Sequence, residues 1–153
     1  MTGEPDPQAE PPLFDEVGFL AVKAAAAGSR LARARLHPLG LHVRSYSALT
    51  VAAASAGGRS QREIAAYLDL DPSQVVGLID ELETAGLVAR EVDPNDRRFR
   101  LIRATAAGSA LLAQARAETA AAEAEALALL TPDERIALLG LLQKIARPGI
   151  PEA

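Results

Sequence analysis

The stretch "SQREIAAYLDLDPSQVVGLIDELETAGLVAREVDPNDRRFRLIRAT", residues 60–105, changes its hydrophobic period partway along. In its first half, apolar residues recur every three or four positions, which is typical of helices that bury one face. In its second half, polar and apolar residues alternate, which is typical of half-buried strands. The stretch therefore predicts two short helices followed by a β-hairpin.

Capping signals delimit these two helices. "SQRE" at the start of the stretch has the spacing of a capping box, in which Ser60 and Glu63 each bond to the other's backbone N–H. Asp71 is expected to cap the second helix, with Pro72 at its first position, where a missing N–H costs nothing. Gly86 is expected to end that helix. Its buried face is predicted to consist of Val75, Leu78, Ile79 and Leu82.

The hairpin carries most of the local charge. Its strands are expected at 87–92 and 98–104, around an Asp-Pro-Asn-Asp turn. Four arginines crowd its second half: Arg97, Arg98, Arg100 and Arg103. Arg100 and Arg103 are an odd number of residues apart, so they fall on opposite faces of the strand. The four arginines therefore cannot all contact one surface of a binding partner, and at least one is expected to contact the protein itself.

Helices are also predicted on both sides of this stretch. They cover Asp15 up to Pro38, residues 44–56 before Gly57-Gly58, an alanine-rich segment from Thr105 to about Leu130, and a last segment from the "TPDE" capping box to Pro148. The first and last helices carry wide apolar stripes that nothing else in the chain is left to cover. A homodimer with a helical interface would bury them. A compact monomeric bundle is the alternative.

Length and composition limit the class of protein. The chain has 153 residues, 49% of them hydrophobic and 3% aromatic, which favours one domain of close-packed helices. It has no cysteine, which excludes disulfides, thiolate metal sites and thiol redox sensing. Residues 1–12 are proline-rich and are expected to form a disordered tail before a single domain at 13–150. With no membrane-length apolar run and no signal pattern, a cytoplasmic protein with no membrane partner is expected.

The net charge of −4 hides an uneven distribution. From Val17 to Arg62 there is no acidic residue, but there are seven basic ones: Lys23, Arg30, Arg33, Arg35, Arg44, Arg59 and Arg62. A local basic face can therefore still meet a polyanion, although an ordinary solvated surface is the other interpretation.

The order of short helix, turn, second helix and hairpin is that of a winged helix-turn-helix. The predicted fold class is thus mainly α with a small β-hairpin wing (α+β). The outer face of the second helix would present Ser73, Gln74 and Gly77, which are small or hydrogen-bonding and can approach base edges. The hairpin arginines would attract the DNA backbone, and one at the tip could enter a minor groove.

From about residue 15 to 147 the chain resembles the MarR family, the multiple-antibiotic-resistance type of transcriptional regulator. The most specific part is the string "LETAGLVAR…DPNDRR…L…T..G". The resemblance implies a ligand-responsive repressor that binds a pseudo-palindromic operator in double-stranded DNA as a homodimer. The winged lobe would occupy about 44–104, between dimerisation helices at 13–36 and 105–147.

The resemblance also implies roles for individual residues. The DNA-binding set is expected to be Ser60, Gln61, Ser73, Gln74, Gly77, Arg97, Arg98 and Arg100. By similarity, either Arg98 or Arg97 enters the minor groove, and Asp96 is a structural acid that steadies the wing. Many members carry arginine where this chain has Gly77, so weaker or differently placed base readout is expected.

Other chemistry finds little support in the sequence. His37 and His42 have no cysteine or acid nearby to complete a metal site, so no metal is expected. With Arg30, they are candidates for an effector site, for which an anionic or aromatic small molecule is favoured. No phosphate loop, dinucleotide fingerprint or catalytic triad is present, so neither an enzyme nor a cofactor is expected. The alternative function is a dimeric helical protein-interaction module that has lost DNA binding.

Overall fold

A computed structural model of the chain describes residues 12–94 and 96–146. Its elements, in chain order, are η1 (Pro12–Asp15), α1 (Val17–Leu36), η2 (His37–Leu39), α2 (Val43–Ala53), β1 (Arg59–Ser60), α3 (Gln61–Leu68), α4 (Pro72–Thr84), β2 (Val88–Val92), β3 (Arg100–Ala104), α5 (Ala106–Ala126) and α6 (Pro132–Ala146). This confirms the mainly helical winged helix-turn-helix fold. Except for Pro12, which begins η1, the tail expected at 1–12 lies outside the described residues, as does Pro148.

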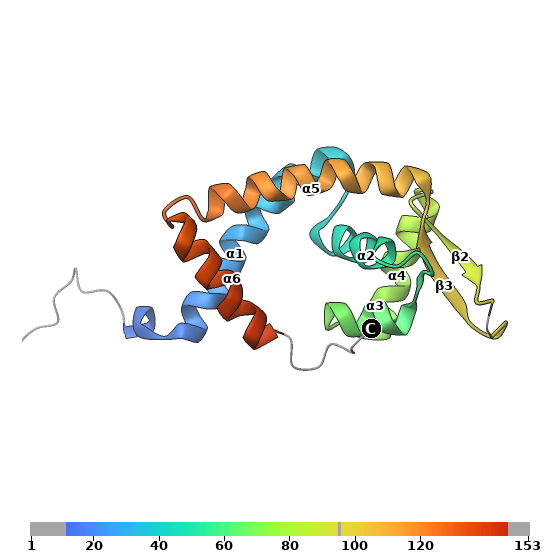
Figure 1. Cartoon of the computed structure of the whole chain (residues 1–153), viewed down its shortest axis with the longest axis horizontal. Helices are drawn as coiled ribbons and strands as arrows, with labels where there is room; N and C mark the ends of the chain where they lie inside the picture. Colours follow the sequence, from blue (N-terminus) through green and yellow to red (C-terminus); the bar gives the residue numbers. More distant parts are fainter. Residues whose placement is uncertain (1–11, 95, 147–153) are drawn as a thin grey trace, which may run out of the picture.

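The long helix α5 connects the two ends of the molecule (Figure 1). At one end α1 packs along it, and at the other end α2, α3, α4 and the sheet gather into a lobe. α6 turns back from the far end of α5 (Figure 1). None of the helices in the described part of the chain is long and apolar enough to cross a lipid bilayer.

One hydrophobic core holds the lobe together. Several helices and the sheet contribute to it, and its largest fully buried apolar side chains are Leu36, Leu41, Leu49, Ile64, Val75, Ile79, Leu82 and Ile102. Leu112 and Ala115 of α5 belong to the same cluster. The lobe is therefore packed directly against the middle of the long helix. Leu78, which was predicted to be buried, is only half-buried.

The capping signals form as predicted. The Ser60 hydroxyl accepts from the Glu63 N–H at 3.2 Å, and the Glu63 carboxylate accepts from the Ser60 N–H at 2.8 Å. This backbone donor lowers the pKa of Glu63 below its ordinary value. At the start of α6, the Thr131 N–H donates to Glu134 at 2.7 Å. Such local hydrogen bonds fix where helices begin, because they satisfy N–H groups that have no partner inside the helix.

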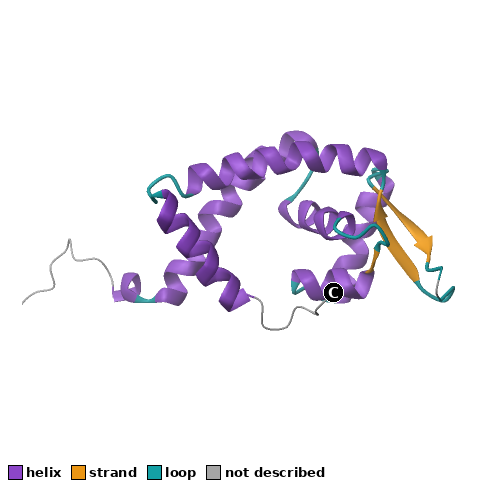
Figure 2. Cartoon of the chain, in the orientation of Figure 1, coloured by secondary structure: helices purple, strands orange, loops and turns teal. Residues whose placement is uncertain are grey.

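The wing contains a strand that the sequence did not predict. β1 pairs antiparallel with β3, Ser60 opposite Leu101, and the sheet has the order β1-β3-β2. Figure 2 shows the three strands at the edge of the helical lobe. Gly57-Gly58 was expected to end α2, but that helix already ends at Ala53. Gly58 instead turns the chain into β1 at φ +82°, where a Cβ would lie 2.8 Å from Cγ of Arg103.

Other boundaries differ from expectation as well. α1 begins at Val17 and not at Asp15, α2 begins at Val43 and not at residue 44, and β2 begins at Val88 and not at residue 87. α5 ends at Ala126 and not near Leu130, and β3 begins at Arg100 and not at Arg98. The last pair of the hairpin is Val92 opposite Arg100, so its strands separate earlier than alternation alone predicts.

The start of α5 is locked against the turn that follows α4. The Thr105 hydroxyl accepts from the Gly108 N–H at 3.0 Å and donates to the Gly86 carbonyl at 2.7 Å. The Thr105 N–H donates to the Leu87 carbonyl at 3.0 Å. A Cβ at Gly108 would lie 1.9 Å from that same Leu87 oxygen. Only glycine permits this approach of helix to backbone.

Gly108→Ala should therefore lower the free energy of unfolding by about 1–3 kcal/mol, as overpacking of a tight site usually does. Urea denaturation of the purified protein measures it. Gly77→Ala is the matched control, because Gly77 is also helical but has nothing within 4 Å of the added Cβ. That control should gain roughly 0.5–1 kcal/mol. Equal urea midpoints for both variants would contradict the locked junction.

Candidate nucleic-acid interface

The outer face of α4 is small and accessible. Ser73, Gln74 and Gly77, the three residues predicted there, are all exposed, and the opposite face enters the core. Val76 joins them on the exposed side, which sequence reasoning missed. Its signal was its position, since Val76 does not follow the spacing of Val75, Ile79 and Leu82, which form the buried face. α4 thus presents polar groups and one methyl-bearing side chain to a partner.

The N-terminus of α4 already holds a carboxylate. Asp71 accepts from the Ser73 N–H at 2.8 Å and from the Ser73 hydroxyl at 2.5 Å. The Ser73 hydroxyl, and then its backbone N–H, lower the pKa of Asp71. The Gln74 side-chain oxygen accepts from the Asp71 N–H at 3.3 Å. Gln74 therefore has both amide N–H donors and one lone pair of its oxygen left to offer.

An arginine on the wing joins it to α4. Arg90 of β2 donates from its guanidinium to both Glu83 and Asp80 of α4. Its backbone N–H also donates to Glu83 at 3.1 Å. Sequence reasoning did not find this network, because its members lie on opposite sides of the Gly86 turn. The network fixes the angle between wing and helix.

The turn of the wing is organised by Asp96. Its carboxylate accepts from the Arg98 backbone N–H at 3.0 Å, from Nε at 3.0 Å and from Nη2 at 2.6 Å. The Arg98 side chain thereby lowers the pKa of Asp96, which stays ionised. The Asp96 carbonyl accepts from the Phe99 N–H at 3.0 Å. Arg98 remains 83% exposed while it is held in this way.

The other wing arginines divide into two groups. Arg103 forms an ion pair with Glu91 of β2, with 3.0 Å between Nε and Oε2, so it is an arginine that contacts the protein. It lies opposite Ala89, whereas Arg100 lies opposite Val92. Arg97 and Arg100 are exposed and make no ion pair within the described residues. Arg97, Arg98 and Arg100 are thus the arginines available to a ligand.

Two of the residues predicted to touch DNA are less accessible. Ser60 and Gln61 are half-buried, and the Ser60 hydroxyl is engaged in its capping box. Gln61 has a buried side-chain nitrogen that lacks a hydrogen-bond partner among the described residues. The structure therefore brings the accessible groups together on α4 and the wing, and not at the start of α3.

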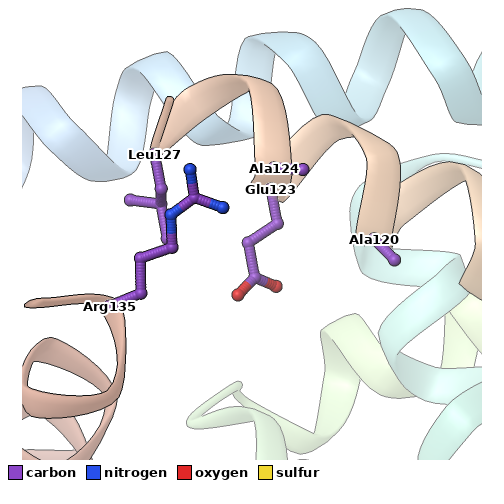
Figure 3. Close-up of a pocket in the computed structure, with 5 residues that line it drawn as sticks. All are labelled: Ala120, Glu123, Ala124, Leu127 and Arg135. Atoms are coloured by element: carbon purple, nitrogen blue, oxygen red, sulfur yellow. The ribbon is translucent and has the colours of Figure 1, made fainter. Parts of the chain in front are cut away.

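The effector candidates are not gathered into a cavity. Arg30, His37 and His42 are all exposed, on α1, on η2 and just before α2. A cavity of about 220 Å³ lies where α5 meets α6 and is lined by Ala120, Glu123, Ala124, Leu127 and Arg135 (Figure 3). A second, of about 170 Å³, is lined by Thr50, Val51, Ala54, Arg59 and Tyr67. Neither cavity includes the three candidates. Within residues 12–94 and 96–146 no group of three potential ligands could hold a metal ion.

Comparison with known proteins agrees with this geometry. Residues 39–98 match the model of the MarR family. CouR from Rhodococcus jostii RHA1, solved with p-coumaroyl-CoA, is 42% identical, with a TM-score of 0.83 over 95% of this chain and 99% of that one. A MarR-family regulator from Rhodococcus sp. RHA1 is 41% identical, with a TM-score of 0.83 over 92% and 98%. A transcriptional repressor, CouR, bound to a 23-mer DNA duplex is 31% identical, with a TM-score of 0.84 over 93% and 100%.

Proposed function

The chain belongs to the MarR family of transcriptional regulators, and we propose that it represses by binding a pseudo-palindromic operator as a homodimer until a small ligand releases it. It is a DNA-binding regulator and not an enzyme. The observation that carries the proposal is that the accessible face of α4 and the arginine wing form one rigid lobe, tied by Arg90. Because the DNA of its bacterial relatives lies in the cytoplasm, we place the protein there.

In this proposal α4 enters a major groove and the wing lies along the neighbouring minor groove. The proposed contacts are Ser73, Gln74, Gly77, Arg97, Arg98 and Arg100, with Val76 added as a contact for a thymine methyl group. Ser60 and Gln61, which are half-buried, are left out of this set. Between the two tip arginines we assign the minor groove to Arg98, because Asp96 holds its guanidinium in one orientation at 83% exposure. Ordering a side chain before it binds lowers the entropy lost on binding.

The wing has to supply most of the attraction for phosphate. A free helix N-terminus favours anions, but here the Asp71 carboxylate already occupies the start of α4. A phosphate near it would meet a like charge. Gly77 also lacks the arginine found there in many family members. Both facts favour the alternative of an interaction module without DNA binding, and the arginine wing favours a DNA-binding protein.

Arg98 and Gln74 should fail differently when each is changed to alanine. Arg98→Ala should weaken binding to operator and to scrambled duplex alike. It should also reduce the salt slope, the slope of log binding constant against log salt concentration, by about one unit for each phosphate that is no longer neutralised. Gln74→Ala should keep that slope and relax preference at one or two base pairs, at a cost of about 1–3 kcal/mol. The operator is first selected from a random duplex pool by the wild-type protein, and both variants are titrated at several salt concentrations.

Arg103→Ala is the control for charge, because its guanidinium is paired with Glu91 and is expected to stay off the DNA. If both Arg97→Ala and Arg98→Ala leave the affinity for DNA and the salt slope unchanged, the hairpin is not a DNA-binding wing. The interaction-module function would then take its place.

The homodimer proposal rests on the apolar faces of the terminal helices. α6 has no buried residue in the described structure. Its exposed large apolar residues are Ile136, Leu139, Leu141, Leu142 and Ile145, and α1 exposes Val17, Leu20 and Val22. So many exposed large apolar groups on two helices of a monomer favour an interface. A second copy of the chain would cover them, with residues 13–36 and 105–147 as dimerisation helices and about 44–104 as the DNA-binding lobe.

Replacing Leu139 and Leu142 by lysine should give monomers or insoluble protein, since two charges would enter an apolar interface. Sizing by light scattering at micromolar concentration measures the outcome. Val92→Lys is the control, because Val92 is 47% exposed but lies on the wing. A wild-type protein that is already monomeric under these conditions would refute the dimer.

For the effector we propose an anionic aromatic compound. The related CouR from Rhodococcus jostii binds p-coumaroyl-CoA, an aromatic acyl thioester that carries phosphates. The acid-free first part of this chain supplies complementary charge, with Arg30, His37 and His42 as candidate contacts. With no cysteine, release has to come from a bound small molecule, a partner or pH, and not from thiol oxidation.

A ligand releases DNA only if it binds the DNA-incompetent form more tightly. Calorimetry with aromatic acids and their coenzyme A thioesters should show binding, and the same compounds should dissociate the operator complex. Neutral amides of the same aromatic acids are the matched control and should bind more weakly. If only neutral compounds dissociate the operator complex, the proposal of an anionic effector is wrong.

A further inference from the structure

Phe99 exposes its ring at the tip of the wing. It is 56% exposed in a chain whose aromatic content is only 3%. The other two phenylalanines, Phe14 and Phe19, contact each other edge to face at 5.6 Å. Within the described structure the ring of Phe99 lies beside Arg98, whose guanidinium carbon is 5.9 Å from the ring centroid. Exposure of a single ring is ordinary by itself, but this ring stands beside the arginine assigned to the minor groove and is placed to contact whatever Arg98 binds.

The backbone holds this ring in place. The Phe99 N–H donates to the Asp96 carbonyl at 3.0 Å, and the Phe99 carbonyl accepts from the Asp93 N–H at 3.1 Å. Asp96 binds Arg98 as well, so one turn positions both the cation and the ring. These hydrogen bonds fix the backbone from which the ring projects, and the ring itself is not part of the core.

Resting on the DNA-binding function proposed above, we propose that Phe99 is an apolar wedge that enters the minor groove beside Arg98 and partly unstacks one base step. Side chains of this kind, inserted from the minor groove, kink the duplex toward the major groove. The guanidinium anchors the wing through charge, and the ring gains its contact by leaving water. Unstacking is cheapest at flexible pyrimidine–purine steps, so the operator should place a TA or CA step under each wing.

This wedge would also give the protein a source of sequence preference. Gly77 has no side chain with which to read a base edge. A wedge discriminates between sequences by how much energy each step needs to deform, without hydrogen bonds to the bases. The preference from Phe99 should thus appear at a position that α4 does not touch.

The alternative role for Phe99 is to support Arg98 through the ring–guanidinium interaction. The two roles differ in their dependence on salt, because the ring carries no charge. Removal of a wedge lowers affinity at every salt concentration and leaves the slope unchanged. Removal of a support for Arg98 reduces the slope, as Arg98→Ala does.

The test uses the duplex selected by the wild-type protein, with 2-aminopurine placed at the step under the wing and a dye on each end. Wild type should brighten 2-aminopurine and bring the dyes closer. Phe99→Ala should abolish both signals and bind about 5- to 150-fold more weakly with an unchanged salt slope, the range known for removing an aromatic ring that stacks on a base. Phe99→Leu should keep part of each signal, since leucine can also serve as a wedge.

Val92→Ala is the matched control on the same hairpin and should leave both signals unchanged. Urea denaturation should show no loss of stability in Phe99→Ala, because the ring lies outside the core. Unchanged affinity and fluorescence in Phe99→Ala, or a salt slope reduced as in Arg98→Ala, would overturn the wedge. A wild-type protein that binds no duplex at all would overturn the repressor function itself, and the wedge with it.

Discussion

The close approach of Gly108 to the Leu87 carbonyl determines how the two halves of the molecule are joined. At this point the first turn of α5 lies directly against the backbone that leaves α4, in space that any Cβ would fill. Thr105 strengthens the junction by bonding to both Gly86 and Gly108. The orientation of α4 relative to the long helix is therefore fixed by backbone geometry. In a dimer built on the terminal helices, that orientation sets the spacing of the two recognition helices and hence of the half-sites they can reach.

A second set of interactions makes the wing part of the same rigid unit. Arg90 connects β2 to two acids of α4, and β1 adds a strand that joins the start of α3 to β3. Helix and wing would then move together when a ligand changes how the lobe sits on α1 and α5. Regulation by this route needs only a small rotation of a stiff body, because both DNA-contacting surfaces turn with it.

The parts of the fold that depend on local signals were predictable from the sequence. Capping boxes at Ser60 and Thr131 and the cap at Asp71 act over three residues, so their spacing is visible in the chain. β1 was not predictable, because two residues have no period and form a strand only through their partner in β3. For the same reason, the role of Arg90 emerged only when folding brought it to α4. The accessible wing arginines were predicted and Arg103 was left out of the DNA-binding set, but its partner Glu91, which lies on the adjacent strand, could not be named from the sequence.

The charge distribution limits how an acidic protein of this kind can hold DNA. The helix N-terminus nearest the groove is already occupied by Asp71, and the net charge is −4. General attraction is therefore weak, and affinity has to come from a few groups that are ordered before binding. Asp96 provides that order for Arg98, although the carboxylate that fixes the guanidinium also offsets part of its charge. The affinity of such a wing for DNA depends more on shape and a fixed orientation than on charge alone. DNA sequences that deform easily should therefore be bound more tightly than stiff ones.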